Sequence, residues 1–374
     1  MILRIAAACA FAALLAFVFV ARASTRMPDF EVYWHAAARA SAAEPLYRED
    51  DGHYQLKYLP GFAVLALPLG WLPLGAAKAA WFAGSALLLV AVLAMSLALL
   101  PDRRKPAWLL VTLTLIVMAK FYGHELVLGQ VNLLLAALAL AAVHLLIRHH
   151  GAAAGALIAI AVVVKPYAVI LVPWLIARRA RAAVIASTVG IAAAIALPAV
   201  IYGAAATVAL HLDWWHTVTA STGPNLLNAD NVSLAAMFAK WLGPGDPAAA
   251  LAFASSLLLV AAAAFVVLRG RHVGQPHGLE AALLLMIMPL LSPQGWDYVL
   301  LVSTPAVMYL LNEERSLPAA LRAATLGALA IIAFSLYDVL GRDAYARFME
   351  WSIISVCYLI VVAALVVLRA RRIA

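Results

Sequence analysis

The chain has 374 residues, of which 66% are hydrophobic and 12% charged, and its mean hydropathy is +0.98. Soluble domains hold roughly 45–50% apolar and about 25% charged residues, so this composition excludes a soluble protein and indicates a polytopic membrane protein. The net charge of +8 comes from arginines in short groups at the ends of apolar stretches, a distribution that argues against a nucleic-acid surface.

The apolar stretches predict an all-α integral membrane protein with about 12 transmembrane helices. Several are shorter than the roughly 20 residues of a full span, which a tilted or internally packed helix tolerates. No repeat or linker divides them, so we expect one domain over residues 1–374. The segments are 5–21, 76–100, 107–119, 131–147, 151–164, 166–177, 183–205, 248–268, 279–291, 298–311, 318–338 and 351–368.

The breaks between these segments alternate in character. One set is short and rich in arginine, whereas the other is longer and carries most of the acidic residues. Because Lys and Arg favour cytoplasmic loops, we expect both termini in the cytoplasm and the acid-rich breaks, with any chemistry, on the outer side. The arginine-rich breaks are 101–106, 148–151, 178–181, 269–272, 312–316 and 369–372.

Two N-terminal segments decide the number of spans. Segment 5–21 fits either a retained first helix or a cleaved signal peptide, and we expect the helix because its basic start is only Arg4. Segment 59–74 holds Pro60, Pro68 and Pro73, which disrupt helix hydrogen bonding, and a span there would place the later arginines outside. We therefore interpret 59–74 as re-entrant or half-inserted.

The first outer loop, residues 22–58, contains a helical pattern. Apolar and aromatic residues from Phe30 to Ala40 recur every three to four positions, which predicts a helix lying in the membrane interface. Asp29 follows Pro28 near the start of this helix, where a carboxylate also stabilises the free backbone N–H groups. A capping role and a chemical role are both open for Asp29.

The break at 120–132 gathers Lys120, His124, Gln130 and Asn132 between two spans. Ionisable groups at membrane depth need partners or water. The amides of Gln130 and Asn132 suit sugar hydroxyls but also bridge helices, and His124 suits a phosphate or an ordinary hydrogen bond.

Three later breaks also carry polar groups. Lys165-Pro166 interrupts an apolar run just below the outer surface, so Lys165 either meets a lipid phosphate or extends toward headgroups. Residues 213–231 form the longest later outer loop. In the loop 291–298, Trp296 fits any membrane interface, while Asp297 either starts a helix or belongs to a site.

Taken together, these motifs resemble the bacterial glycosyltransferase family 87. That family consists of membrane-embedded GT-C-type enzymes and includes polyprenol-phosphate-mannose-dependent α-1,2-mannosyltransferases. The resemblance covers most of the chain in matching order. The motifs that carry it are Asp29…Tyr33…Ala36-Ala37…Leu46-Tyr47, Tyr58-Leu59-Pro60, Leu67-Pro68…Leu72-Pro73, Gly129-Gln130-Val131-Asn132, Lys165-Pro166 and Ser292-Pro293…Trp296.

The resemblance implies a GT-C-type fold in the bacterial plasma membrane, with the active site facing the periplasm. It implies that Asp29 is the catalytic base, which removes the proton of an acceptor hydroxyl as that hydroxyl attacks the anomeric carbon. For the donor phosphate we expect Lys165, His124 and Lys120. For the sugar and the acceptor we expect Glu31, Tyr33, Tyr58, Gln130, Asn132, Trp296 and Asp297.

The implied reaction moves a hexose, with mannose as the first candidate, from a polyprenyl-phosphate sugar to a hydroxyl of a lipid-linked or glycan acceptor, with inversion. We expect no metal and no other cofactor, because the donor has a single phosphate and no acidic cluster shows metal-ligand spacing. Many relatives carry a histidine just after the loop tryptophan, where this chain has Asp297-Tyr298, so the donor is left open.

A polytopic transporter or lipid flippase is the main alternative, since it too carries ionisable groups within the membrane. An enzyme predicts one outward cavity that holds Asp29, whereas a transporter predicts a midplane site between related halves. A non-catalytic assembly partner predicts that Asp29 and Lys165 lie far apart or face lipid.

Overall fold

The computed structural model describes residues 13, 15–270, 272 and 277–372, and these residues form helices without a β-strand. The predicted all-α fold class is therefore confirmed. Residues 5–12 and 14 lie outside the described part, so the choice between a signal peptide and a first helix stays a prediction.

The N-terminal half combines short helices in the first loop with longer apolar helices after it. Its elements are η1 (Phe19–Ala23), α2 (Pro28–Ser41), η2 (Glu49–Tyr54), α3 (Pro60–Leu65), α4 (Leu67–Gly70), α5 (Leu74–Ala98), α6 (Ala107–Leu128), α7 (Asn132–Ile147), α8 (Gly151–Val164), η3 (Pro166–Ile170), α9 (Leu171–Ala177) and α10 (Arg181–Ala196).

The C-terminal half continues in the same manner. Its elements are α11 (Ala199–Tyr202), α12 (Ala204–Leu226), α13 (Leu234–Leu242), α14 (Asp246–Arg269), α15 (His277–Leu291), η4 (Asp297–Ser303), α16 (Thr304–Glu313), η5 (Glu314–Ser316), α17 (Ala319–Phe334), α18 (Tyr337–Leu340), α19 (Arg342–Glu350) and α20 (Ile353–Arg371).

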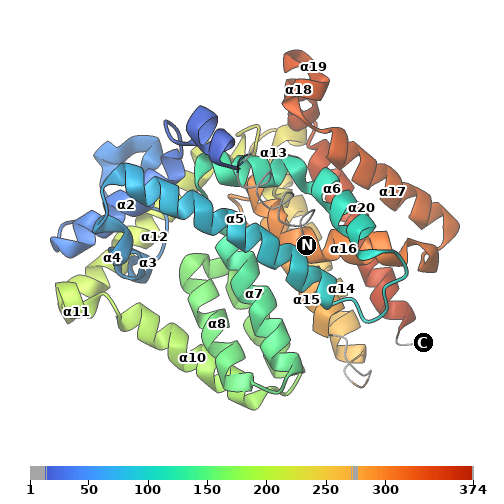
Figure 1. Ribbon diagram of the computed structural model, residues 1–374, viewed down its shortest axis with the longest axis horizontal. Helices are drawn as coiled ribbons and strands as arrows, with labels where there is room; N and C mark the ends of the chain where they lie inside the picture. Colours follow the sequence, from blue (N-terminus) through green and yellow to red (C-terminus); the bar gives the residue numbers. More distant parts are fainter. Residues whose placement is uncertain (1–12, 14, 271, 273–276, 373–374) are drawn as a thin grey trace.

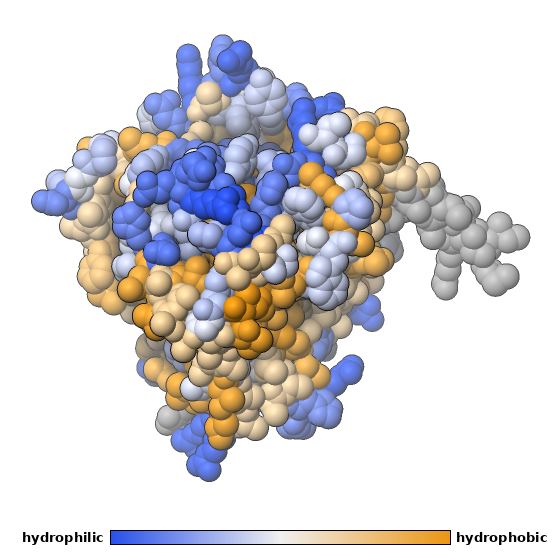
Figure 2. Space-filling view, turned by 90° about the vertical axis from the view of Figure 1, so that its left-hand side faces the viewer, coloured by the Kyte–Doolittle hydropathy of each residue, from blue (hydrophilic) through white to orange (hydrophobic). Residues whose placement is uncertain are grey.

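Five helical stretches in the described part are long and apolar enough to cross a membrane, namely α5, α6, Arg181–Tyr202, α14 and α20. Shorter apolar helices accompany them, including α7, α8, α15 and α17. Figure 2 shows a broad area of hydrophobic side chains below a hydrophilic area on one face, as a bilayer environment requires. The count of about 12 spans and the position of α2 in the membrane interface stay predictions.

Helix α15 lies at the centre of the core, because all its residues from Gly278 to Leu290 are buried. It contacts α7, α14, α16 and α20. On one side of the molecule α7, α8 and α10 run side by side (Figure 1). Gly155 and Gly190 permit the close approach of α8 and α10, since a Cβ on Gly155 would collide with the carbonyl oxygen of Ala183.

Helix α6 continues past the expected end of its segment. The sequence predicts a span that ends at residue 119 and a break over residues 120–132, which is wrong because α6 is helical to Leu128. The helix tolerates Lys120 because its ammonium nitrogen lies 2.9 Å from the carboxylate of Asp297. A charged residue therefore did not mark a helix end here, since tertiary packing supplied its partner.

Gly129 ends α6 with φ 71° and ψ 36°, in the left-handed region that glycine adopts without strain. A Cβ at this position would lie 2.7 Å from the Cβ of Phe30 and 2.9 Å from the terminal methyl of Met27. The absence of a side chain thus lets α2 pack directly on the turn after α6.

Most of the expected loop 213–231 is also helical, because α12 extends to Leu226. Hydroxyl side chains in this part donate to carbonyl oxygens one turn earlier. Thr219 donates to the carbonyl of Trp215 at 2.7 Å, and Thr222 donates to that of Val218 at 2.8 Å. The prediction of a loop from polar residues is therefore wrong for residues 213–226, which are helical.

Segment 59–74 forms two very short helices, α3 with 6 residues and α4 with 4 residues. Pro60 and Pro68 each stand in the first turn of one helix, where a missing N–H is tolerated, and Pro73 directly precedes α5. Neither helix is long enough to cross a bilayer. The re-entrant placement of this segment stays a prediction.

Candidate active site

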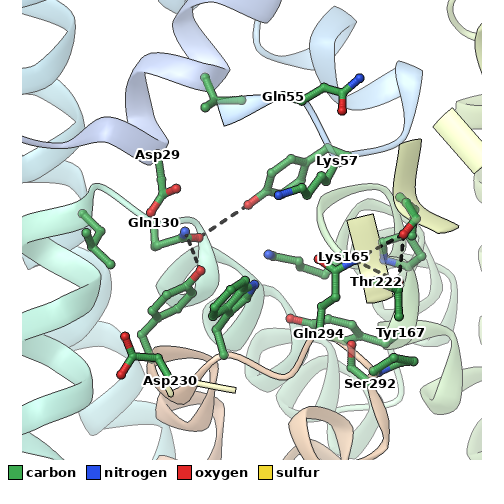
Figure 3. Close-up of a pocket in the computed structure, with 18 of the residues that line it drawn as sticks. Asp29, Gln55, Lys57, Gln130, Lys165, Tyr167, Thr222, Asp230, Ser292 and Gln294 are labelled. Atoms are coloured by element: carbon green, nitrogen blue, oxygen red, sulfur yellow. Dashed lines mark hydrogen bonds between the residues drawn. The ribbon is translucent and has the colours of Figure 1, made fainter. Parts of the chain in front are cut away.

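A cavity of about 660 Å³ lies beside the N-terminal end of α2. Its volume falls within the roughly 300–1,000 Å³ of small-molecule sites. Segments far apart in the sequence meet around it (Figure 3). The polar and aromatic residues that line it include Asp29, Tyr33, His53, Gln55, Lys57, Tyr58, Gln130, Lys165, Tyr167, Trp214, Thr222, Asn228, Asp230, Ser292, Gln294, Trp296 and Tyr298.

Asp29 reaches the cavity because α2 begins at Pro28. Directly before it, Met27 donates its backbone N–H to the carbonyl oxygen of Val127 in α6 at 3.1 Å, which fixes the start of α2. Burial raises the pKa of the Asp29 carboxyl above its ordinary value, while a hydrogen bond from Gln130 opposes the increase. A half-buried carboxylate with a raised pKa has the properties of a general base.

Gln130 joins three tyrosines next to Asp29. Its Oε1 accepts a hydrogen bond from the Tyr33 hydroxyl at 3.1 Å, and the hydroxyls of Tyr33 and Tyr58 lie 2.7 Å apart. Its Nε2 donates to the Tyr298 hydroxyl at 3.1 Å. Partners on both sides hold the amide in one position, so Gln130 and the tyrosines form a connected polar wall of the cavity.

Lys165 lines the cavity from the break between α8 and η3. The backbone of Lys165 is extended, with φ −147° and ψ 112°, because the following Pro166 disfavours helical geometry at the preceding residue. The predicted break is therefore confirmed. The Lys165 ammonium lies 4.7 Å from the centroid of the Tyr58 ring, a cation–π contact that leaves its N–H donors directed to the cavity (Figure 3).

Lys120, His124 and Asp297 form a separate group that does not line this cavity. Lys120 Nζ lies 2.9 Å and His124 Nδ1 lies 3.3 Å from the Asp297 carboxylate. The side chains of Lys120 and Asp297 are only 3% and 1% exposed, so they form a buried ion pair. The charged groups of these residues point to one another and not into the cavity. Their roles toward phosphate or sugar stay predictions.

Glu31 and Asn132 also have protein partners and lie outside the cavity lining. Lys78 Nζ is 2.6 Å from Glu31 Oε1, and Asn132 Nδ2 donates to the Glu125 carboxylate at 2.9 Å. The predicted site residues that the structure brings together around the cavity are Asp29, Tyr33, Tyr58, Gln130, Lys165 and Trp296.

Sequence reasoning missed several lining residues that lie one or two positions from a motif. Lys57 precedes Tyr58, and Tyr167 follows Pro166. Gln294 lies inside the Ser-Pro…Trp loop, and its amide donates to the hydroxyls of Ser221 and Thr222 in α12 at 3.0 Å each. Adjacency to the motifs was the signal that would have identified these residues.

Comparison with known proteins adds to this geometry. A family model matches residues 56–293, more than half of the chain, and its description is glycosyltransferase family 87. The chain belongs to glycosyltransferase family 87. The resemblance inferred from the motifs is confirmed, and together with the apolar helices it makes this protein a membrane glycosyltransferase. No curated protein and no solved structure matches the chain.

The match to family 87 includes Lys57, Gln130 and Lys165 but begins after α2. Asp29 and Trp296 lie outside the matched residues, so their place in the site rests on the cavity they share with the matched ones. The family 87 segment thus supplies most of the cavity, and α2 completes one wall of it.

Proposed function

We propose that this family 87 glycosyltransferase moves a hexose from a polyprenyl-phosphate sugar to a hydroxyl of a lipid-linked or glycan acceptor. Mannose is the first candidate for the hexose, and the outer face of the bacterial plasma membrane is the proposed place of reaction. The observation that carries the proposal is that Asp29 and Lys165, a base and a cation, line one cavity. Transfer of a sugar from a phosphate requires a base for the acceptor hydroxyl and a cation for the phosphate that leaves.

In the proposed reaction, Asp29 accepts the proton of the acceptor hydroxyl while that oxygen forms a bond to the anomeric carbon. The bond from this carbon to the phosphate oxygen breaks, and its electron pair leaves with the prenyl phosphate. Lys165 stabilises the charge on that leaving group. A single displacement inverts the anomeric carbon, and a positioned general base contributes about 10²–10⁴-fold to such a step.

The remaining lining supports a sugar and a lipid chain as ligands. Gln130 and the hydroxyls of Tyr33 and Tyr58 provide donors and acceptors that match sugar hydroxyls. Ile170 and Leu291 line the same cavity and give it an apolar part that suits a prenyl chain. Membership of a glycosyltransferase family favours this reaction over transport of a lipid.

The experiment is transfer of radiolabelled sugar to membrane lipid extract from a small panel of polyprenyl-phosphate sugars. Purified full-length protein is compared with Asp29→Asn and with Asp50→Asn, which changes an exposed carboxylate in the same loop. EDTA is present throughout because we expect a reaction without a metal. We expect transfer by the wild type and by Asp50→Asn, and loss of transfer in Asp29→Asn.

Equal transfer by all three proteins would remove Asp29 as the base. No transfer by the wild type from any donor in the panel would contradict the proposed donor class and return the transporter to consideration. Recovery of activity on adding Mg²⁺ or Mn²⁺ would contradict the expected independence from metal.

A further inference from the structure

Two of the six lysines in this chain differ from the other four in their surroundings. Lys78, Lys105 and Lys120 each lie within 3.3 Å of a carboxylate oxygen. Lys240 donates to the backbone carbonyls of Ala229 and Asn231 at 2.9 and 2.8 Å. Lys57 and Lys165 form no ion pair with any carboxylate that the structure describes, and both line the cavity.

Lys57 is held in place by its backbone rather than by a counter-charge. Its carbonyl oxygen accepts a hydrogen bond from the Trp214 indole at 3.1 Å, and its ammonium makes only a long contact of 3.4 Å with the carbonyl of His53. The next residue, Tyr58, presents the ring beneath the Lys165 ammonium. The two lysines line one cavity, although 108 positions separate residues 57 and 165 in the sequence.

Lys57 and Lys165 are half-buried cations that repel one another. The carboxylates of Glu125 and Asp29 attract Lys165, but neither forms an ion pair with it among the described residues. Burial lowers the pKa of the Lys57 ammonium, and the nearby Asp29 carboxylate raises it. Asp29 forms no direct ion pair with either lysine in the described residues, so a ligand has room to bind both ammonium groups. Lysine recognises phosphate as a point charge, without the planar geometry that arginine imposes.

The charge of the phosphate changes during the proposed reaction. A sugar linked through a phosphodiester carries one negative charge, whereas the prenyl phosphate that leaves is a monoester with about 1.5 to 2 negative charges at pH 7. One cation balances the donor, and a second cation becomes useful only as the bond to the sugar breaks. Interactions that are stronger in the transition state than in the ground state accelerate the reaction.

We propose that Lys57 and Lys165 together form a two-lysine site for the donor phosphate, in which Lys57 stabilises the charge that develops on the leaving prenyl phosphate. The inference rests on the proposed function and adds Lys57, a residue that the motifs did not identify. The ligand that the two lysines bind most tightly is expected to be a phosphate monoester that carries a long apolar chain.

The test measures binding of farnesyl phosphate to the full-length protein in detergent, with farnesol and inorganic phosphate as separate ligands. Intrinsic tryptophan fluorescence, to which Trp214 and Trp296 in the cavity lining contribute, provides the signal, and calorimetry checks it. The variants are Lys57→Gln, Lys165→Gln and Lys57→Arg, and the control is Lys105→Gln, whose ion pair with Glu314 lies outside the cavity.

We expect Lys57→Gln and Lys165→Gln each to weaken farnesyl phosphate binding about tenfold to a hundredfold, the range for losing a hydrogen bond to a charged group. Farnesol binding is expected to be unchanged, and Lys105→Gln is expected to bind like the wild type. Lys57→Arg keeps the charge and is expected to retain most of the affinity, which also controls for folding. In the transfer assay, Lys57→Gln is expected to lower kcat more than it raises KM.

Different failures point to different errors. If only Lys165→Gln weakens binding and Lys57→Gln transfers sugar normally, the two-lysine site is overturned and the proposed function stands. If the wild type binds farnesol as tightly as farnesyl phosphate, both the site and the proposed donor class are overturned. If inorganic phosphate binds as tightly as farnesyl phosphate, the pair serves a free anion and the lipid phosphate assignment is overturned.

Discussion

The cavity and the buried cluster around Glu280 accommodate charge in opposite ways. Glu280 is fully buried and accepts hydrogen bonds from Arg178 at 2.7 Å, Arg369 at 2.9 Å and Trp174 at 2.9 Å. In the cavity, Asp29 and the two lysines share a space without direct ion pairs among the described residues. A buried charge with protein partners holds helices together, whereas a charge left facing a cavity is available to a ligand.

The largest effect is expected at the cavity carboxylate. Asp29→Asn removes the proposed base while keeping the size of the side chain, and we expect kcat to fall by about 10²–10⁴-fold. The radiolabel transfer assay measures the change, and thermal unfolding in detergent verifies that the variant is folded. A variant that unfolds like the wild type yet keeps its kcat would place Asp29 among the structural carboxylates.

The opposite pattern is expected for the cluster. Glu280→Gln leaves two guanidinium groups facing a neutral amide, and we expect a loss of roughly 3–5 kcal/mol in the free energy of unfolding. Denaturant titration in detergent measures this loss, with the exposed Glu350→Gln as a control. The KM of the folded fraction is expected to be unchanged. A raised KM with normal stability would contradict a purely structural role for the Glu280 cluster.

An intermediate effect is expected for Gln130, which supports Asp29 without being a proposed base. Gln130→Leu removes the hydrogen bonds to Tyr33 and Tyr298 and leaves buried hydroxyls with fewer partners. We expect a loss of about 1–3 kcal/mol in transition-state stabilisation, measured as kcat/KM. The Gln130→Asn variant keeps the amide group on a shorter side chain. It shows whether the position of the amide matters as well as its presence.

The pH profile offers a further test of the cavity. Because Asp29 acts as a base when deprotonated and burial raises its pKa, activity should fall as pH decreases through a value above the ordinary 3.8. Gln130 opposes that increase, so Gln130→Leu should move the acid limb of kcat/KM to higher pH. An acid limb that stays in place in this variant would mean that another group controls the profile.

The smallest effect is expected for His124, although the sequence predicts a phosphate role for it. His124 faces the buried Asp297 and not the cavity, and its side chain is 41% exposed. His124→Asn is therefore expected to change donor KM by no more than about twofold, as for substitutions away from a site. A tenfold rise in KM would restore the predicted phosphate role and connect the Asp297 group with the cavity.

Much of the candidate site was accessible from sequence because its residues stand at breaks in apolar segments. Proline fixed two of these positions, since Pro28 opens α2 just before Asp29 and Pro166 ends α8 at Lys165. Such local signals act on the backbone regardless of what packs against it. They therefore predicted the helix in the first loop and the break at Lys165, both of which the structure contains.

Residue types and their spacing are enough to identify an all-helical membrane protein of family 87 whose polar groups gather between apolar segments. Which charges have partners depends on how the helices pack. Lys120 and Asp297 are 177 positions apart and pair because α6 packs on η4. Lys57, beside a motif, lines the cavity and forms no ion pair with a carboxylate in the described part of the chain. Helix periodicity and proline act through neighbours in the chain, but ion pairing depends on distances of a few ångströms that packing alone sets.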